Sequence, residues 1–186
     1  MGYRVPLMLL IMILTFGCSD ESESAAQELY DIATQHRKAD QYQRAMAILQ
    51  EITIDYGDTE VGKRAEEEIS ELRTLEEMKL QNQARKIQTS FSSIGRALEN
   101  YKARFLVYPM TPKDLDKLPA VVVPDWDDVW GKEIFYTPIY SKPDLAKHLP
   151  DGYALASFGM DGLPGGERQN KDHFYKNGKI VSRVTE

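Results

Sequence analysis

The residues best suited to chemistry lie in one glycine-rich segment near the end of the chain. Residues 157–172 read SFGMDGLPGGERQNKD and include four glycines, a proline, two aspartates and an asparagine. This composition disfavours both helix and strand, because Gly and Pro interrupt regular structure while Asp and Asn favour turns. Carboxylate and amide oxygens are also the ligands that hard cations prefer. The segment is therefore predicted to be a structured loop that either turns tightly or binds a cation.

The elements around this loop must position it, and they have the pattern of short strands. An apolar run at 152–156 precedes the loop, so a strand is expected over 153–156, and another over 134–137. After the loop, residues 174–181 form two apolar stretches around Asn177-Gly178, a dipeptide that favours a type I′ hairpin turn. Residues 113–118 are predicted to form a short helical turn. These signals predict a small antiparallel sheet.

A long helix is expected before these strands. Residues 59–105 contain no proline, and Thr59 is a plausible N-cap. Apolar residues recur at steps of three and four along the second half, which is the pattern of one buried helical face: Ile87, Phe91, Ile94, Leu98, Tyr101 and Phe105. The pattern predicts one helix, or two nearly collinear helices, with the sheet packed on the second half. The expected fold class is α+β.

Two shorter helices are predicted upstream, over 25–39 and 42–56, after a polar tether at 18–24. Their apolar positions resemble one tetratricopeptide repeat at Leu29, Ala33, Tyr42, Ala45, Leu49 and the Tyr56-Gly57 ending. A plain helical hairpin is the alternative interpretation. A single repeat is rarely stable alone, so a capping helix is needed, and residues 59–83 could supply it.

The second half of the chain resembles a known family. The motifs, in order, are Ala97-Leu98-Glu99-Asn100-Tyr101, Tyr108-Pro109-Met110-Thr111, Asp128-Val129-Trp130-Gly131, Phe135-Tyr136, Gly152-Tyr153 and the loop itself. Together they resemble the C-terminal domain of the major pseudopilin of type II secretion systems, over roughly residues 84–175. The resemblance implies a helix packed on a small antiparallel sheet, with one calcium ion in the loop.

The same resemblance implies the calcium ligands. The family's acidic positions fall on Asp161, Asn170 and Asp172, and the backbone carbonyls of Leu155 and Ser157 could contribute. Asn170 stands where an aspartate is common, so the site would carry less charge and bind calcium more weakly. The ion would be structural, linking the loop to the sheet. The alternative is that Asp161-Gly162 is only a turn and that Asp172 only improves solubility.

The amino terminus departs from the pseudopilin pattern. Arg4 is followed by about 12 apolar residues, which form a stretch too short to span a bilayer, and then by Gly17-Cys18. This arrangement resembles a bacterial lipoprotein signal over 1–17, with the thiol of Cys18 carrying lipid after cleavage. An ordinary signal peptide with a chance cysteine is the alternative. Ser19 favours the outer membrane over the inner one, with the body of the protein facing the periplasm.

Composition and motifs restrict the function. The net charge of −6 argues against a nucleic-acid partner, and a single cysteine rules out an internal disulfide. His36, His148 and His173 are scattered, and no nucleophile or phosphate-binding motif is evident. Asp125, Asp127 and Asp128 are interpreted as a solvated acidic loop, although a weak hydrolase site would also use such a cluster. We therefore expect no enzyme.

The expected organisation is a leader (1–17), a tether (18–24), a tetratricopeptide-like region (25–83) and a pseudopilin-like domain (84–186). The resemblance implies an envelope lipoprotein that meets protein partners in the periplasm as an accessory component of a type II secretion or type IV pilus-like system. A calcium-stabilised periplasmic scaffold unrelated to secretion is the alternative.

Overall fold

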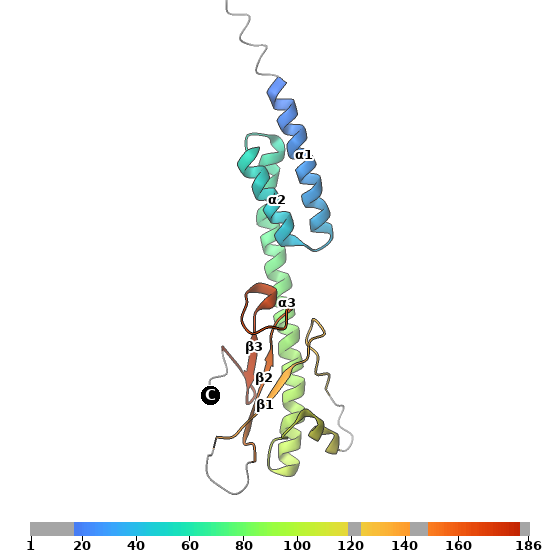
Figure 1. Cartoon of the computed structure of the whole chain (residues 1–186), viewed down its shortest axis with the longest axis vertical. Helices are drawn as coiled ribbons and strands as arrows, with labels where there is room; N and C mark the ends of the chain where they lie inside the picture. The colour runs from blue at the N-terminus through green and yellow to red at the C-terminus, as the bar shows by residue number, and fades with distance from the viewer. Residues whose placement is uncertain (1–16, 119–123, 142–148, 183–186) are drawn as a thin grey trace, which may run out of the picture. The chain divides into compact units, whose positions relative to one another are not determined.

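The computed structural model describes residues 17–118, 124–141 and 149–182, and for residues 17–20 it gives the backbone only (Figure 1). The predicted α+β class is confirmed. The elements are α1 (Gly17–Lys38), α2 (Tyr42–Asp55), α3 (Glu60–Phe105), β1 (Phe135–Ile139), β2 (Gly152–Ser157), β3 (His173–Lys176) and β4 (Lys179–Val181), with short 3-10 helices η1 (Pro112–Lys117) and η2 (Arg168–Asn170). The chain divides into two compact units between Met78 and Lys79, inside α3.

The first unit is built around small residues on α1 and α2. Ala26, Ala33 and Ala45 are all at most 2% exposed, which lets the helices approach closely, and larger side chains fill the space beside them. The rest of the buried cluster comprises Met46, Leu49, Ile52, Val61, Ala65 and Leu72. Ile32 is 43% exposed, because the buried face of α1 is the one that carries Ala26 and Ala33.

The predicted tether is helical in the structure, because α1 already begins at Gly17. The side chain of Glu23 gives this early start a role: its two carboxylate oxygens accept hydrogen bonds from the backbone N–H groups of Glu60 and Val61, each at 3.1 Å. A carboxylate is favourable there because the first N–H groups of a helix lack internal partners and carry partial positive charge. The predicted N-cap is confirmed, since Thr59 Oγ1 accepts from the backbone N–H of Gly62 at 2.9 Å.

Two glutamates on α3 are buried in the first unit. Glu68 accepts from Arg37 at 2.6 Å and from the hydroxyl of Tyr30. Glu76 is 2% exposed, and both of its carboxylate oxygens accept from the side-chain amide of Gln43 at 2.8 Å. The neighbouring Leu75 is 39% exposed, because Glu76 occupies the buried face of α3 at this point.

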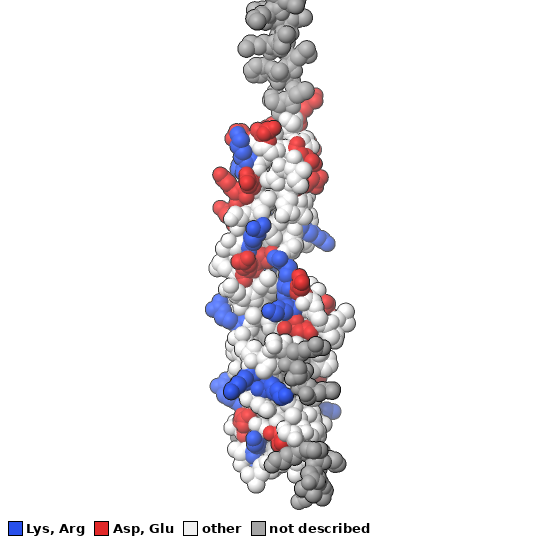
Figure 2. Space-filling view, turned by 90° about the vertical axis from the view of Figure 1, so that its left-hand side faces the viewer, with Lys and Arg blue, Asp and Glu red and all other residues white. Residues whose placement is uncertain are grey.

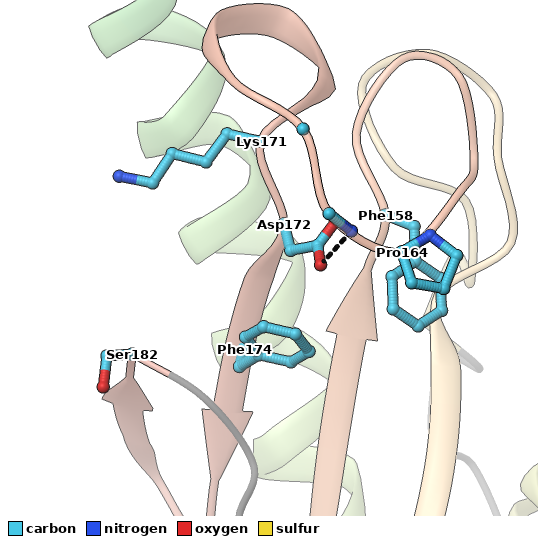
Figure 3. Close-up of a pocket in the computed structure, with 8 residues that line it drawn as sticks. Phe158, Pro164, Lys171, Asp172, Phe174 and Ser182 are labelled. Atoms are coloured by element: carbon cyan, nitrogen blue, oxygen red, sulfur yellow. Dashed lines mark hydrogen bonds between the residues drawn. The ribbon is translucent and has the colours of Figure 1, made fainter.

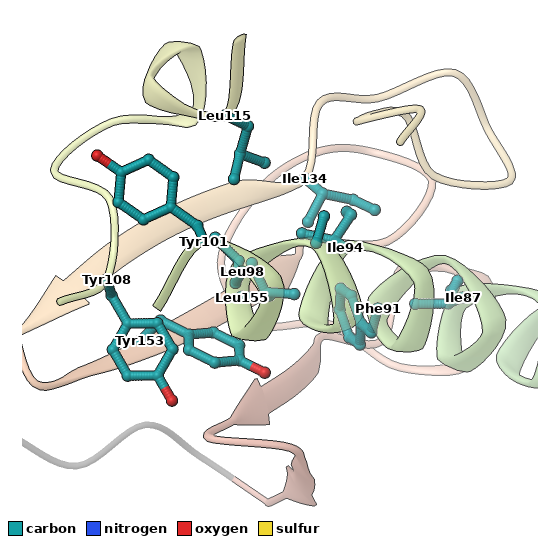
Figure 4. Packing of buried hydrophobic residues seen from close by; sticks show 11 residues of the cluster. Ile87, Phe91, Ile94, Leu98, Tyr101, Tyr108, Leu115, Ile134, Tyr153 and Leu155 are labelled. Carbon is teal, nitrogen blue, oxygen red and sulfur yellow. The ribbon is translucent and has the colours of Figure 1, made fainter. Parts of the chain in front are cut away.

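The second unit packs one face of the sheet on α3. The strands follow one another as an antiparallel meander in the order β1-β2-β3-β4, and Tyr136, Leu155 and Tyr175 stand opposite one another across it. Figure 4 shows these strands over the buried side chains of α3. The predicted stripe is confirmed from Ile87 through Tyr101, whereas Phe105 is 38% exposed because the helix ends there.

The connections in this unit agree with the predicted turns. Asn177 and Gly178 have φ angles of 47° and 85°, the left-handed pair that a type I′ turn requires. The turn predicted at 113–118 is η1, which buries Leu115.

On the face shown in Figure 2, acidic and basic side chains lie in small mixed groups. Among the described residues, no helix combines the length and apolarity needed to cross a membrane.

Candidate functional site

A buried polar pair holds the start of the glycine-rich loop. Ser157 ends β2, and its hydroxyl donates to Asp128 Oδ2 at 2.7 Å. The other oxygen of Asp128 accepts from the backbone N–H groups of Trp130 and Lys132 at 2.9 and 3.0 Å. The carboxylate therefore fixes its own turn and ties that turn to the sheet.

The interpretation of Asp128 as part of a solvated acidic loop is wrong. Its side chain is buried at 8% exposure, whereas Asp125 and Asp127 are exposed. A buried carboxylate is tolerated here because three donors satisfy it. The sequence carried a signal for this role: an aspartate followed by a glycine three positions later favours a turn closed by the aspartate side chain.

The loop then folds closely around Asn170. A β-carbon added to Gly159 would lie 2.5 Å from the backbone carbon of Asn170, and the φ angle of Gly159 is +65°, so only glycine fits at this position. The backbone N–H of Met160 donates to the carbonyl of Gln169 at 2.9 Å. These contacts bring the two halves of the loop together and position η2, which contains Asn170.

The two predicted acidic ligands have different surroundings. Asp161 is exposed, and its Oδ1 accepts from the backbone N–H of Leu163 at 3.1 Å, as in a simple turn. Asp172 Oδ2 accepts from the backbone N–H of Gly165 at 2.8 Å, drawn as the dashed line in Figure 3. Asp172 Oδ1 is buried and has no hydrogen-bond partner among the described residues. Asp172 also lines a pocket of about 550 Å³ with Phe158, Pro164 and Phe174.

The structure brings only part of the predicted ligand set together. Asn170 and Asp172 lie two positions apart, shortly before β3, and no hydrogen bond joins the carboxylate of Asp161 to either of them. Leu155 is paired with a strand on each side, so its carbonyl belongs to the sheet ladder, whereas Ser157 ends β2 at the loop. Among the described residues, no three His, Cys, Asp or Glu side chains form a group that could hold a metal.

The unpaired oxygen of Asp172 is the feature that fits a cation. A buried carboxylate oxygen without a donor is costly, and a bound cation would offset that cost. Asn170, two positions earlier in the chain, could supply an amide oxygen. The residues that would hold calcium are therefore Asp172 and Asn170 first, with Asp161 joining them if the loop closes on the ion.

The far side of the same loop contributes to a second pocket, of about 260 Å³, beside α3. Trp130 lines it, and the indole Nε1 is buried without a partner among the described residues. His173 also lines the pocket, and its pKa is lowered by burial and by Lys171, while Asp172 and Asp128 act in the opposite direction. This pocket could not be predicted from local sequence patterns, because its residues come from three separate segments.

The predicted lipid site lies at the edge of the described chain. Cys18 falls in the first turn of α1, where the structure gives the backbone only. Residues 1–16 of the predicted leader lie outside the described residues.

Comparison of the chain with protein-family models, curated proteins and solved structures gave no match.

Proposed function

We propose that this chain is a non-enzymatic envelope lipoprotein that acts as an accessory or interaction component of a type II secretion or type IV pilus-like system. The observation that carries the proposal is the architecture of the second unit. A helix packs on a four-stranded antiparallel meander, and the connection from β2 to β3 is a folded glycine-rich loop that begins at the Asp128–Ser157 pair. This arrangement supports the pseudopilin-like interpretation of residues 84–186.

The chain is proposed to be a partner of a filament and not a filament subunit. A pseudopilin packs its filament through an apolar amino-terminal helix, but here the stretch of α3 before Ile87 is charged. Residues 77–86 read EMKLQNQARK, and most of their side chains are exposed. Burying these charges in a filament core would carry a large desolvation cost. The charged stretch therefore belongs in water.

The first unit would present a surface to a partner protein. Its two-helix hairpin, capped by the start of α3 and packed through small residues, supports the interpretation as one tetratricopeptide-like repeat. Cys18 would carry lipid at the start of α1. Since α1 continues without a break into the hairpin, this unit would sit close to the membrane that holds the lipid.

Calcium would stabilise the loop and have no catalytic role. Asp172 and Asn170 would bind the ion, with Asp161 completing the set, and the cation would offset the unpaired Asp172 oxygen. Such a site links folding to metal binding, because the ion binds the folded loop and not the unfolded chain. A rigid loop would then offer a defined surface to a partner.

The proposal is tested by a crosslinked pull-down of the lipidated protein from cells that are actively exporting protein. We expect secretion or pilus components in the crosslinked fraction, and we expect fewer of them with Cys18→Ser, which removes the lipid site. A matched control is Ser19→Ala, which leaves the cysteine in place. If only components unrelated to export are recovered, the secretion role is wrong and the free-standing scaffold is favoured.

A further inference from the structure

The pocket of about 260 Å³ between α3 and the second half of the glycine-rich loop lies wholly within the second unit. Its walls come from one turn of α3, from the turn that Asp128 fixes, and from the segment around η2 and β3. The residues that matter for its chemistry are Leu80, Gln83, Ala84, Trp130, Lys171 and His173, with Arg168 at the rim. This pocket is distinct from the one that Asp172 lines, although Lys171, which lies between Asn170 and Asp172, lines both.

The lining is basic in a chain whose net charge is −6. Arg168 and Lys171 are the charged residues of the lining, which includes no aspartate or glutamate. Arg168 also adopts a φ angle of +56°, a left-handed conformation that residues with a β-carbon rarely adopt. Backbone strain of this kind persists where the surrounding structure demands it, commonly at binding sites. The charge favours an anionic ligand.

Two buried atoms of opposite hydrogen-bonding character lie in the same lining. Trp130 Nε1 is a donor and Gln83 Oε1 is an acceptor, and neither has a partner among the described residues. Buried polar atoms are nearly always paired, so a ligand that both accepts and donates would satisfy this pocket. A carboxylate would accept from the indole N–H, and an adjacent amide N–H would donate to the glutamine oxygen after small side-chain adjustments.

We infer that this pocket binds the carboxyl terminus of a polypeptide. The terminal carboxylate would lie near Lys171 and the Trp130 indole, and the last peptide N–H would donate to Gln83. Leu80 and Ala84 would contact an apolar terminal side chain. The volume lies just below the ~300–1,000 Å³ of sites for whole small molecules, so it suits the last one or two residues of a chain. Capture of a terminal carboxylate is an established mode of peptide recognition. The inference goes beyond the proposed function, because it adds a peptide ligand and does not require a role in export.

The test uses the mature chain with Cys18→Ser and two probes, N-acetyl-leucyl-leucine as the free acid and the same dipeptide with an amidated end. Binding is followed by the indole N–H resonance of Trp130, which is assigned by its loss in Trp130→Phe. We expect a saturable shift of this resonance while that of Trp126 stays in place. The free acid should bind about tenfold more tightly than the amide, since it alone presents a charged acceptor.

Two variants separate a peptide site from general attraction of anions. Lys171→Gln should weaken binding of the free acid about tenfold, whereas Lys179→Gln, an exposed lysine outside the pocket, should leave it unchanged. Equal binding of acid and amide would overturn the inference, as would a lack of any shift up to about 10 mM probe. Sodium acetate that competes as well as the dipeptide would also overturn it, because the site would then recognise any carboxylate. A failed pull-down of secretion components would leave these results unaffected.

Discussion

Ser157 and Asp128 are 29 positions apart in the sequence, yet the hydroxyl of the first donates a 2.7 Å hydrogen bond to the carboxylate of the second, and both side chains are buried. This pair joins the end of β2 to the turn before β1. Both pockets beside the glycine-rich loop depend on it, because Trp130 lies in that turn and the loop begins at Ser157.

Removal of the Asp128 carboxylate should destabilise the second unit. In Asp128→Ala, the Ser157 hydroxyl and two backbone N–H groups lose their acceptor, so we expect a loss of about 2–4 kcal/mol in the free energy of unfolding. Asp128→Asn keeps one acceptor oxygen and should cost less. Urea denaturation measures both. The control Asp127→Asn changes an exposed neighbour and should stay within about 0.5 kcal/mol of wild type. Equal effects at the two positions would contradict the role of Asp128.

Gly95 should not tolerate a larger side chain. In an exposed helix, Gly→Ala stabilises by about 1 kcal/mol, but a β-carbon on Gly95 would lie 2.9 Å from the hydroxyl of Tyr153 and 3.2 Å from Cε1 of Tyr175. We therefore expect Gly95→Ala to lower the free energy of unfolding by about 1–3 kcal/mol. Ser92→Ala, on the exposed side of the same helix, is the control and should be neutral or slightly stabilising. A stabilising Gly95→Ala would show that the sheet lies further from α3.

Glu23 should stabilise the start of α3. Its carboxylate accepts from two backbone N–H groups at the first turn of that helix, so Glu23→Ala should cost about 1 kcal/mol, a typical value for loss of a helix cap. Thermal unfolding followed by circular dichroism would measure it. Glu28→Ala removes an exposed glutamate from the same helix and should leave the melting temperature unchanged. If the two variants behave alike, residues 19–24 do not form the helical contact described above.

Asp114 should make stability sensitive to acid. The hydrogen bond from Lys117 Nζ, 2.6 Å from its carboxylate, lowers the pKa of Asp114, and the backbone N–H of Thr111 adds to this effect. The unfolded chain therefore binds the proton more readily. The contribution of Asp114 is fully present above the unfolded pKa of about 4 and is lost as pH falls through the lower folded pKa.

The measurement is urea unfolding across this acidic range. Asp114→Asn should flatten the dependence of stability on pH relative to wild type, and Asp116→Asn, which changes an exposed carboxylate nearby, should not. If Asp114→Asn keeps the full acid sensitivity, that sensitivity comes from other carboxylates.

Calcium should raise the melting temperature of the mature chain, and a chelator should lower it, because the ion binds only the folded loop. Asp172→Asn and Asp161→Ala should each reduce this response, with the larger effect expected at Asp172, whose Oδ1 is buried and unpaired. Asp127→Asn should respond to calcium like wild type. The same melting curve with and without chelator would exclude the site, and both acidic residues would then be structural parts of the turns.

The sequence alone determined the elements of this fold. The three-and-four spacing from Ile87 to Tyr101, the Asn177-Gly178 turn and the Thr59 cap are local patterns, and the structure confirms each of them. Local patterns suffice here because backbone angles and the buried face of a helix depend on residues within a few positions of one another.

Only the tertiary structure decided which polar groups are buried and what they contact. Asp128 looked like its exposed neighbours in sequence, and Glu76 looked like part of a charged helix, but both are buried because partners from distant segments satisfy them. The different surroundings of Asp161 and Asp172, and the placement of Gln83 and Trp130 in the lining of one pocket, depend in the same way on how the loop packs against α3. Burial and hydrogen bonding are properties of the packed chain, and spacing along the sequence does not fix them.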